Sequence, residues 1–318
     1  MRIHLADASK ERRQYQTLVE ERYTATLFSY AYPLVCNQYA PPMWDELVKL
    51  HLTSTTHRLG NGDETRNLLF QEKCSEHLFS YAYQGQEHLW KECWGQMIDF
   101  RPRVIIDSGA FTAYTSGKPI DPRDYAKWAL DFKERWEHKM QALYFMNLDV
   151  IGDQDASWVN QSILEGLGLK PIPIITFGAN KKHLIRALDN YDYIALGGLV
   201  PYTRDKVKLQ KWLDFCFAII MQKYKATGVM PKIHLLGITT DWVLKRYPCF
   251  SSDSSTWVSC LRFGRGSAAG IKQLPRYKES DAAMASTIHT LRAEIRKYKK
   301  MEQEATNLWT KRGIIFND

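Results

Sequence analysis

The stretch Val104-Ile105-Ile106-Asp107-Ser108-Gly109-Ala110-Phe111 decides the fold class. Its run of β-branched apolar residues predicts a strand buried on both faces, which is typical of a parallel sheet covered by helices. The aspartate and the Ser-Gly pair lie where this strand reaches the edge of the sheet, and α/β proteins carry functional residues there. The stretch therefore predicts a parallel α/β fold with a site at the strand ends.

Apolar runs that end in an acid or a glycine recur at Tyr144–Asp149, Tyr193–Leu199, Ile233–Gly237 and Cys249–Ser255. The complete set of predicted strands covers residues 26–31, 104–108, 143–149, 172–177, 193–197, 233–237, 249–253 and 259–263. Amphipathic segments of helix length lie between them, at residues 123–139, 154–166, 180–190, 206–226 and 241–247. Strands and helices in this alternation predict an α/β fold of the (β/α)8 TIM-barrel type.

Two segments lie outside this repeat. A long insertion extends from about residue 40 to about residue 100. We expect it to be helical, because a structureless loop of that length is improbable in a compact domain. The sequence Phe-Ser-Tyr-Ala-Tyr occurs at 28–32 and again at 79–83, which leaves open which copy belongs to the first barrel strand. Residues 280–311 predict a long polar helix or helix pair. We expect a barrel domain over residues 1–280 and a helical extension over 281–318.

The composition narrows the class of protein. The net charge of +8 favours a polyanionic partner, and Arg262, Arg265 and Lys272 are the candidate nucleic-acid contacts, because glycines near the arginines expose backbone N–H groups. No apolar run is long enough to span a membrane and no signal peptide is evident, so we expect a cytoplasmic protein without a membrane partner. The six cysteines show no CxxC spacing, which favours reduced thiols over a disulfide framework or a zinc ribbon.

The candidate site consists of acids and glycine turns at predicted strand ends. Asp107, Asp149 and Asp253 each follow an apolar run, as do Gly197-Gly198 and Gly237. Two carboxylates on either side of an anomeric carbon are the groups that cleave a glycosidic bond. Glycine allows the backbone to approach a flat heterocycle closely. A single aspartate of this kind is more often a helix cap, but the set together predicts glycosidic-bond chemistry on a nucleoside.

The same motifs carry a family resemblance. Asp107-Ser108-Gly109-Ala110-Phe111, Leu148-Asp149, Leu196-Gly197-Gly198-Leu199, His234-Leu235-Leu236-Gly237 and Phe250-Ser251-Ser252-Asp253 resemble, in order and spacing, the motif series of the tRNA-guanine transglycosylases. The resemblance extends from about residue 104 to residue 257. None of the motifs is specific alone, and the specificity lies in their order.

The resemblance implies a role for each site residue. Asp253 would be the nucleophile at C1′, Asp107 the general acid and base, and Asp149 the acceptor for the guanine edge. Ser108 would add a supporting hydrogen bond. Stacking and backbone contacts to the base would come from Phe111, Leu236, Gly197, Gly198, Leu199 and Gly237. No cofactor and no metal are implied.

The departures from the family pattern favour its DNA-directed branch. The three-cysteine, one-histidine zinc site of the tRNA enzymes is missing after the last motif, where only Cys260 remains, and Phe177 stands where the family usually has a glutamine. The chain is therefore similar to the transglycosylases of bacteria and phages that exchange guanine in DNA for 7-cyano-7-deazaguanine or a related free base. Tyr114 or Trp257 is then a candidate to hold the flipped nucleotide.

Three alternatives stay open at this stage. In the first, the protein exchanges the base in tRNA and not in DNA. In the second, water replaces the incoming base, and the protein is a hydrolytic purine N-glycosidase. In the third, the chain is a barrel that binds nucleic acid without catalysis. The sequence leaves open which 7-deazapurine is used, and it leaves the oligomeric state open.

Overall fold

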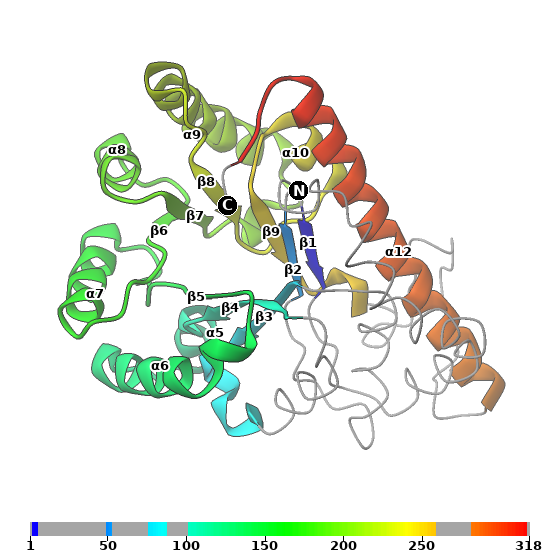
Figure 1. Ribbon diagram of the computed structural model, residues 1–318, viewed down its shortest axis with the longest axis horizontal. Helices are drawn as coiled ribbons and strands as arrows, with labels where there is room; N and C mark the ends of the chain where they lie inside the picture. The colour runs from blue at the N-terminus through cyan, green and yellow to red at the C-terminus, as the bar shows by residue number, and fades with distance from the viewer. Residues whose placement is uncertain (1, 6–48, 53–75, 88–100, 259–280, 317–318) are drawn as a thin grey trace.

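The computed structural model describes residues 2–5, 49–52, 76–87, 101–258 and 281–316 (Figure 1). Its centre is a nine-stranded sheet in the order β5-β4-β3-β2-β1-β9-β8-β7-β6. The strands are β1 (Arg2–Leu5), β2 (Lys49–Leu52), β3 (Glu76–Ser80), β4 (Arg103–Asp107), β5 (Ala142–Phe145), β6 (Ile174–Thr176), β7 (Tyr193–Gly197), β8 (Lys232–Leu235) and β9 (Ser251–Ser254). The pairings are parallel except for β1 with β2, and both of these strands also pair with β9. The predicted α/β class with a parallel sheet is confirmed.

The two ends of this strand order, β5 and β6, are joined by an isolated parallel bridge between Met146 and Ile172. Asn147 N donates to Ile172 O at 2.9 Å, and Ile172 N donates to Phe145 O at 2.7 Å. The bridge lies just beyond β5 and just before β6. The named strands β5 and β6 do not pair with each other, so strand pairing describes an open sheet. The closed eight-stranded barrel therefore stays a prediction.

Helices follow most strands of the described chain. They are α5 (Ala110–Ser116), α6 (Pro122–Trp136), α7 (Gln154–Gly166), α8 (Lys181–Asn190), α9 (Lys206–Thr227), α10 (Asp241–Arg246) and α12 (Asp281–Lys311). Side-chain caps begin four of them: Asp121, Asp153, Asn180 and Asp205 each accept a hydrogen bond from a backbone N–H of the first turn. The helices predicted between residues 123 and 247 are confirmed to within a few residues, because their caps and apolar spacing are local signals.

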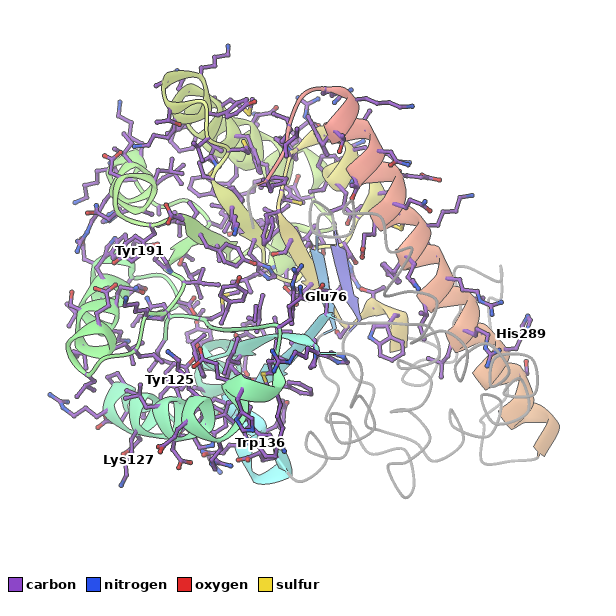
Figure 2. All side chains as sticks on the ribbon, in the orientation of Figure 1. Glu76, Tyr125, Lys127, Trp136, Tyr191 and His289 are labelled. Atoms are coloured by element: carbon purple, nitrogen blue, oxygen red, sulfur yellow. The ribbon has the colours of Figure 1, made fainter. Side chains whose placement is uncertain are left out.

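The helices pack one face on the sheet and expose the other. On α6, Tyr125 is fully buried and donates to Met146 O at 2.9 Å, whereas Lys127 is exposed (Figure 2). The last helix, α12, packs in the same way, with Leu291 and Ile295 fully buried. Trp309 Nε1 donates to Leu244 O of α10 at 2.8 Å, so the C-terminal helix is anchored on the outer layer of the fold.

The N-terminal part of the chain departs from the prediction. β1 was not predicted, and the insertion at 40–100 is not purely helical, because it contributes β2, β3 and the short 3-10 helix η2 (Tyr81–Gln86). β2 alternates polar and apolar residues, Lys49-Leu50-His51-Leu52, and this period of two is a strand signal, whereas β3 does not alternate. The second Phe-Ser-Tyr copy lies at the end of β3. The predicted strands at 26–31 and 259–263 lie outside the described residues.

Candidate functional site

Asp107 is the last residue of β4, and one of its carboxylate oxygens is anchored. Ser80 pairs with Asp107 across β3 and β4, and Ser80 Oγ donates to Asp107 Oδ2 at 2.8 Å. Gly109 N donates to the same oxygen at 3.0 Å. Gly109 has φ of 79°, and a Cβ added there would lie 2.8 Å from Cβ of Ala82, so only glycine fits this turn. Oδ1 has no hydrogen-bond partner among the described residues.

Asp253 on β9 is anchored in the same way. Its Oδ1 accepts from Gly237 N at 2.6 Å and lies 3.2 Å from His234 Nε2. Gly237 has φ of 72°, and a Cβ added there would lie 2.4 Å from Val200 Cγ2, so a side chain would strain the turn that donates to Asp253 unless Val200 moved. Asp253 Oδ2 has no hydrogen-bond partner in the described part of the chain, and the side chain keeps 9% of its surface exposed.

The third acid, Asp149, lies four residues beyond the end of β5 and is half-buried. Burial first, and then the negative charge of Asp107, raise the pKa of Asp149 from 3.8 to about 7, while its own backbone N–H lowers it. No other hydrogen-bond donor of the described residues reaches this carboxylate. A carboxylate in this state favours a ligand that brings its own N–H donors.

The mutual effects of the three acids on their pKa values indicate that they belong to one site. Burial raises the pKa of Asp107, hydrogen bonds from Ser80 and Gly109 lower it, and the charge of Asp253 raises it again. Asp107 in turn raises the pKa of Asp149. Like charges that influence one another across three strand ends lie close together, and the site disfavours full ionisation of all three.

A buried hydrogen-bond chain below Asp253 was not predicted from the sequence. His234 Nδ1 lies 2.6 Å from Ser251 Oγ, and Ser251 Oγ lies 2.5 Å from the Tyr193 hydroxyl. His234 and Ser251 are fully buried, and Tyr193 is 9% exposed. The only sequence signal was a histidine inside an apolar run, which is more often a satisfied core residue. Ser80 was missed too, although it ends a strand next to the Asp107 strand.

The remaining predicted ligands line the same strand ends. Leu236 is half-buried, with its Cδ1 3.3 Å from the position of a Cβ on Gly197, and the Leu199 side chain is fully buried. Gly198 is partly exposed, as backbone recognition of a base requires. Phe111 on α5 is 60% exposed. Ser108 is fully buried, and its Oγ has no hydrogen-bond partner among the described residues.

One expectation changes at this point. Trp257 is fully buried, so it is not free to hold a nucleotide, whereas Tyr114 is 66% exposed on α5. Phe177 stacks on Tyr202 with ring centroids 3.8 Å apart. The predicted nucleic-acid contacts Arg262, Arg265 and Lys272 lie outside the described residues.

The described residues contain neither a candidate metal site nor a candidate membrane span. Within the described ranges, no group of three or more His, Cys, Asp or Glu side chains could hold a metal ion. None of the helices there combines the length and the apolar character that a membrane span needs.

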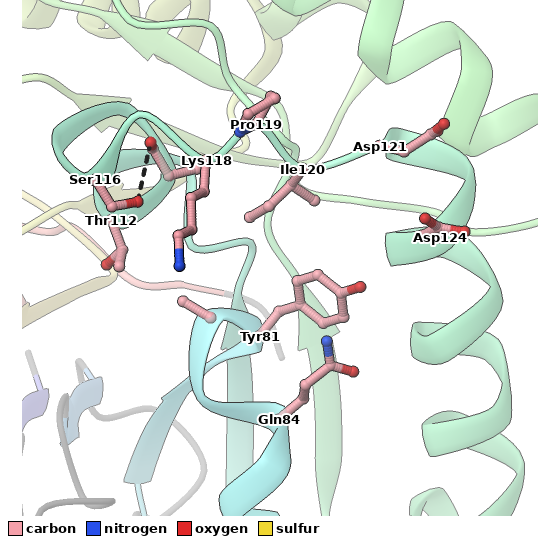
Figure 3. Close-up of a pocket in the computed structure, with 11 residues that line it drawn as sticks. Tyr81, Gln84, Thr112, Ser116, Lys118, Pro119, Ile120, Asp121 and Asp124 are labelled. Carbon is pink, nitrogen blue, oxygen red and sulfur yellow. Dashed lines mark hydrogen bonds between the residues drawn. The ribbon is translucent and has the colours of Figure 1, made fainter.

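A cavity of about 350 Å³ lies on the other side of α5, between this helix and η2. Figure 3 shows the Lys118 side chain in this space, near Tyr81 and Gln84. None of the three acids lines it. The cavity is therefore separate from the carboxylate site.

Comparison with known proteins does not assign the chain. No protein-family model matches it, and no curated protein matches it. The functional argument therefore depends on the residues of the site themselves.

Proposed function

We propose that the protein is a base-exchange transglycosylase that replaces guanine in DNA with a 7-deazaguanine of the 7-cyano-7-deazaguanine type. The observation that carries this proposal is the pair Asp107 and Asp253: among the described residues, each carboxylate has one oxygen held by hydrogen bonds and one oxygen without a partner. A nucleophile and a proton carrier need this arrangement, because the reacting oxygen must be free while the other fixes the side chain. The proposal includes closure of the sheet into a barrel at the β5–β6 bridge.

In the proposed reaction, Oδ2 of Asp253 forms a bond to C1′, the C1′–N9 bond breaks, and its electron pair leaves with guanine. Asp107 gives its proton to the departing base, and burial, which raises the pKa of Asp107, favours the protonated form that this step needs. In the second half, Asp107 takes the proton from N9 of the incoming base. This nitrogen attacks C1′ and releases the Asp253 carboxylate.

Asp149 supports the choice of a guanine-like edge. Its carboxylate accepts and does not donate when ionised, so it matches the N1–H and 2-amino donors of guanine. The described protein supplies only the Asp149 backbone N–H as a donor. Two hydrogen bonds from the base would therefore supply the donors that the Asp149 carboxylate lacks. They would also discriminate against adenine, which has an acceptor at N1.

An exposed basic segment supports a nucleic-acid substrate. Arg204, Lys206 and Lys208 come after the 3-10 helix η4 (Val200–Tyr202) that follows β7; they are exposed and have no ion-pair partner among the described residues. Lys206 lies over the ring of Trp242 and Lys208 over the ring of Tyr202, and one oxygen of Asp205, the acid between them, accepts from the Lys208 backbone N–H at 3.0 Å. Exposed cations without acidic partners favour phosphate contacts. DNA is preferred over tRNA because the cysteine cluster that holds zinc in the tRNA enzymes is missing from the sequence.

The test is incubation of the pure protein with labelled 7-cyano-7-deazaguanine and either DNA or tRNA. We expect label in DNA, and none with Asp253→Asn, while the surface variant Asp192→Asn retains activity. Label in tRNA only would refute the DNA substrate. Release of guanine without incorporation of label would instead identify a hydrolytic N-glycosidase. If neither label nor free guanine is detected, the protein is not this enzyme.

A further inference from the structure

We propose that His234, Ser251 and Tyr193 form a positioning chain that fixes which oxygen of Asp253 attacks C1′. The proposal rests on the function proposed above for Asp253. It assigns a role to a histidine that is fully buried. Its basis is the continuous series of hydrogen bonds from the Tyr193 hydroxyl to Asp253 Oδ1.

The sheet register brings the four residues together. His234 of β8 pairs with Ser251 of β9 on one side and with Ala195 of β7 on the other. Because side chains alternate along a strand, Ser251 and Asp253 lie on the same face of β9, and Tyr193 lies on the same face as Ala195. The neighbouring strands therefore carry Tyr193, His234 and Asp253 on one face of the sheet.

The proposal assigns the hydrogen positions in this chain. Among the described residues the Tyr193 hydroxyl has one hydrogen-bond partner, Ser251 Oγ, so we assign the buried phenol as the donor to it. Burial raises the pKa of Tyr193, which keeps the phenol protonated. The Ser251 hydrogen then goes to its other partner, His234 Nδ1, which must accept. In a neutral ring the hydrogen is then on Nε2, which lies 3.2 Å from Asp253 Oδ1.

This assignment has a consequence for the nucleophile. Oδ1 then accepts two hydrogen bonds, one from His234 Nε2 and one from Gly237 N, and Oδ2 accepts none from the residues that the structure describes. An oxygen that accepts two donors is the weaker nucleophile, since its lone pairs are engaged. When the ester to C1′ forms through Oδ2, Oδ1 becomes the carbonyl oxygen and keeps both donors. His234 thus acts through Asp253 and is a positioning residue.

The kinetic test compares two substitutions at His234. His234→Phe fills a similar space without a donor, and His234→Gln supplies an amide N–H near the Nε2 position. We expect His234→Phe to lower kcat by about 10- to 100-fold, the range for a hydrogen bond to a charged group, with KM for the free base almost unchanged. His234→Gln should recover at least part of kcat. The matched control is His183→Phe, because His183 is a buried histidine that accepts from Trp158 Nε1 far along the chain from the acids.

A folded His234→Phe enzyme with full kcat would overturn the proposal, and so would a rise in KM with unchanged kcat. If this variant does not fold, Ser251→Ala decides, because it frees Nδ1 and should also lower kcat. A second readout is independent of activity: the 15N NMR shifts of the His234 ring should report hydrogen on Nε2 in the intact protein. Hydrogen on Nδ1 would refute the positioning chain, whereas Nε2–H in a protein without exchange activity would refute only the proposed function.

Discussion

Asp149→Asn should make the protein more stable at alkaline pH while it impairs base binding. Asp149 carries a charge in a half-buried position with only its own backbone N–H as a hydrogen-bond donor, and its pKa rises from 3.8 to about 7 on folding. Asparagine has nearly the same shape and no charge. The substitution therefore removes the unfavourable burial of the charge and keeps the packing.

The magnitude follows from linkage. Below pH 3.8 Asp149 is protonated in both the folded and the unfolded chain, so it does not make the free energy of unfolding depend on pH. Between pH 3.8 and 7 the unfolded chain loses the proton first, so the folded state becomes less stable as the pH rises. At 1.36 kcal/mol per pKa unit, the cost is about 1.7 kcal/mol at pH 5 and about 4 kcal/mol at pH 8. These are upper values, because water reaches part of the side chain.

The assay is urea unfolding of wild type and Asp149→Asn at pH 5 and pH 8. The stability advantage of the variant should grow by about 2.5 kcal/mol between the two pH values, while the exposed-site control Asp192→Asn should show no such growth. An advantage that is equal at both pH values, or that shrinks as the pH rises, would refute the reasoning. In exchange assays the variant should show a raised KM for the free base, because an amide offers one acceptor where a carboxylate offers two.

Three further predictions concern the rest of the site. Asp107→Asn should lower kcat for label incorporation by about 10²- to 10⁴-fold, the usual contribution of a general acid, and a loss confined to KM would contradict its role. Gly237→Ala should lower the free energy of unfolding by about 1–3 kcal/mol in urea melts, since its φ of 72° and the contact with Val200 disfavour a Cβ; an unchanged melt would contradict this strain. The double variant Arg204→Glu and Lys206→Glu should weaken DNA binding. It should also reduce the slope of log K against log salt concentration by about 0.9 per lost phosphate contact. The control Lys170→Glu, which lies before β6 at the opposite edge of the sheet, should change neither the affinity nor the slope.

The sequence predicted the elements between residues 102 and 254 well. The strands Arg103–Asp107, Tyr193–Gly197 and Lys232–Leu235 and the helices between them depend on local signals: apolar runs, caps and glycine turns. The N-terminal strands depend on partners far away in the chain. β1 pairs with β9, about 250 residues later, and four residues carry too little periodicity to indicate a strand by themselves. For this reason β1 was missed and the region of β2 and β3 was expected to be helical.

The sequence by itself determined which residues reach the strand ends, because a buried apolar run must end where the chain turns, and the acid or glycine that follows is therefore at the edge. It did not determine the order of the three acids along that edge, because the sheet places β4, which carries Asp107, between β5, which precedes Asp149, and β9, which carries Asp253. Only the tertiary structure decided how each acid is held: Ser80 and Gly109 anchor Oδ2 of Asp107, and Gly237 and His234 anchor Oδ1 of Asp253. These contacts join residues up to 27 positions apart through strand register, and register is a property of the assembled sheet that no single segment contains.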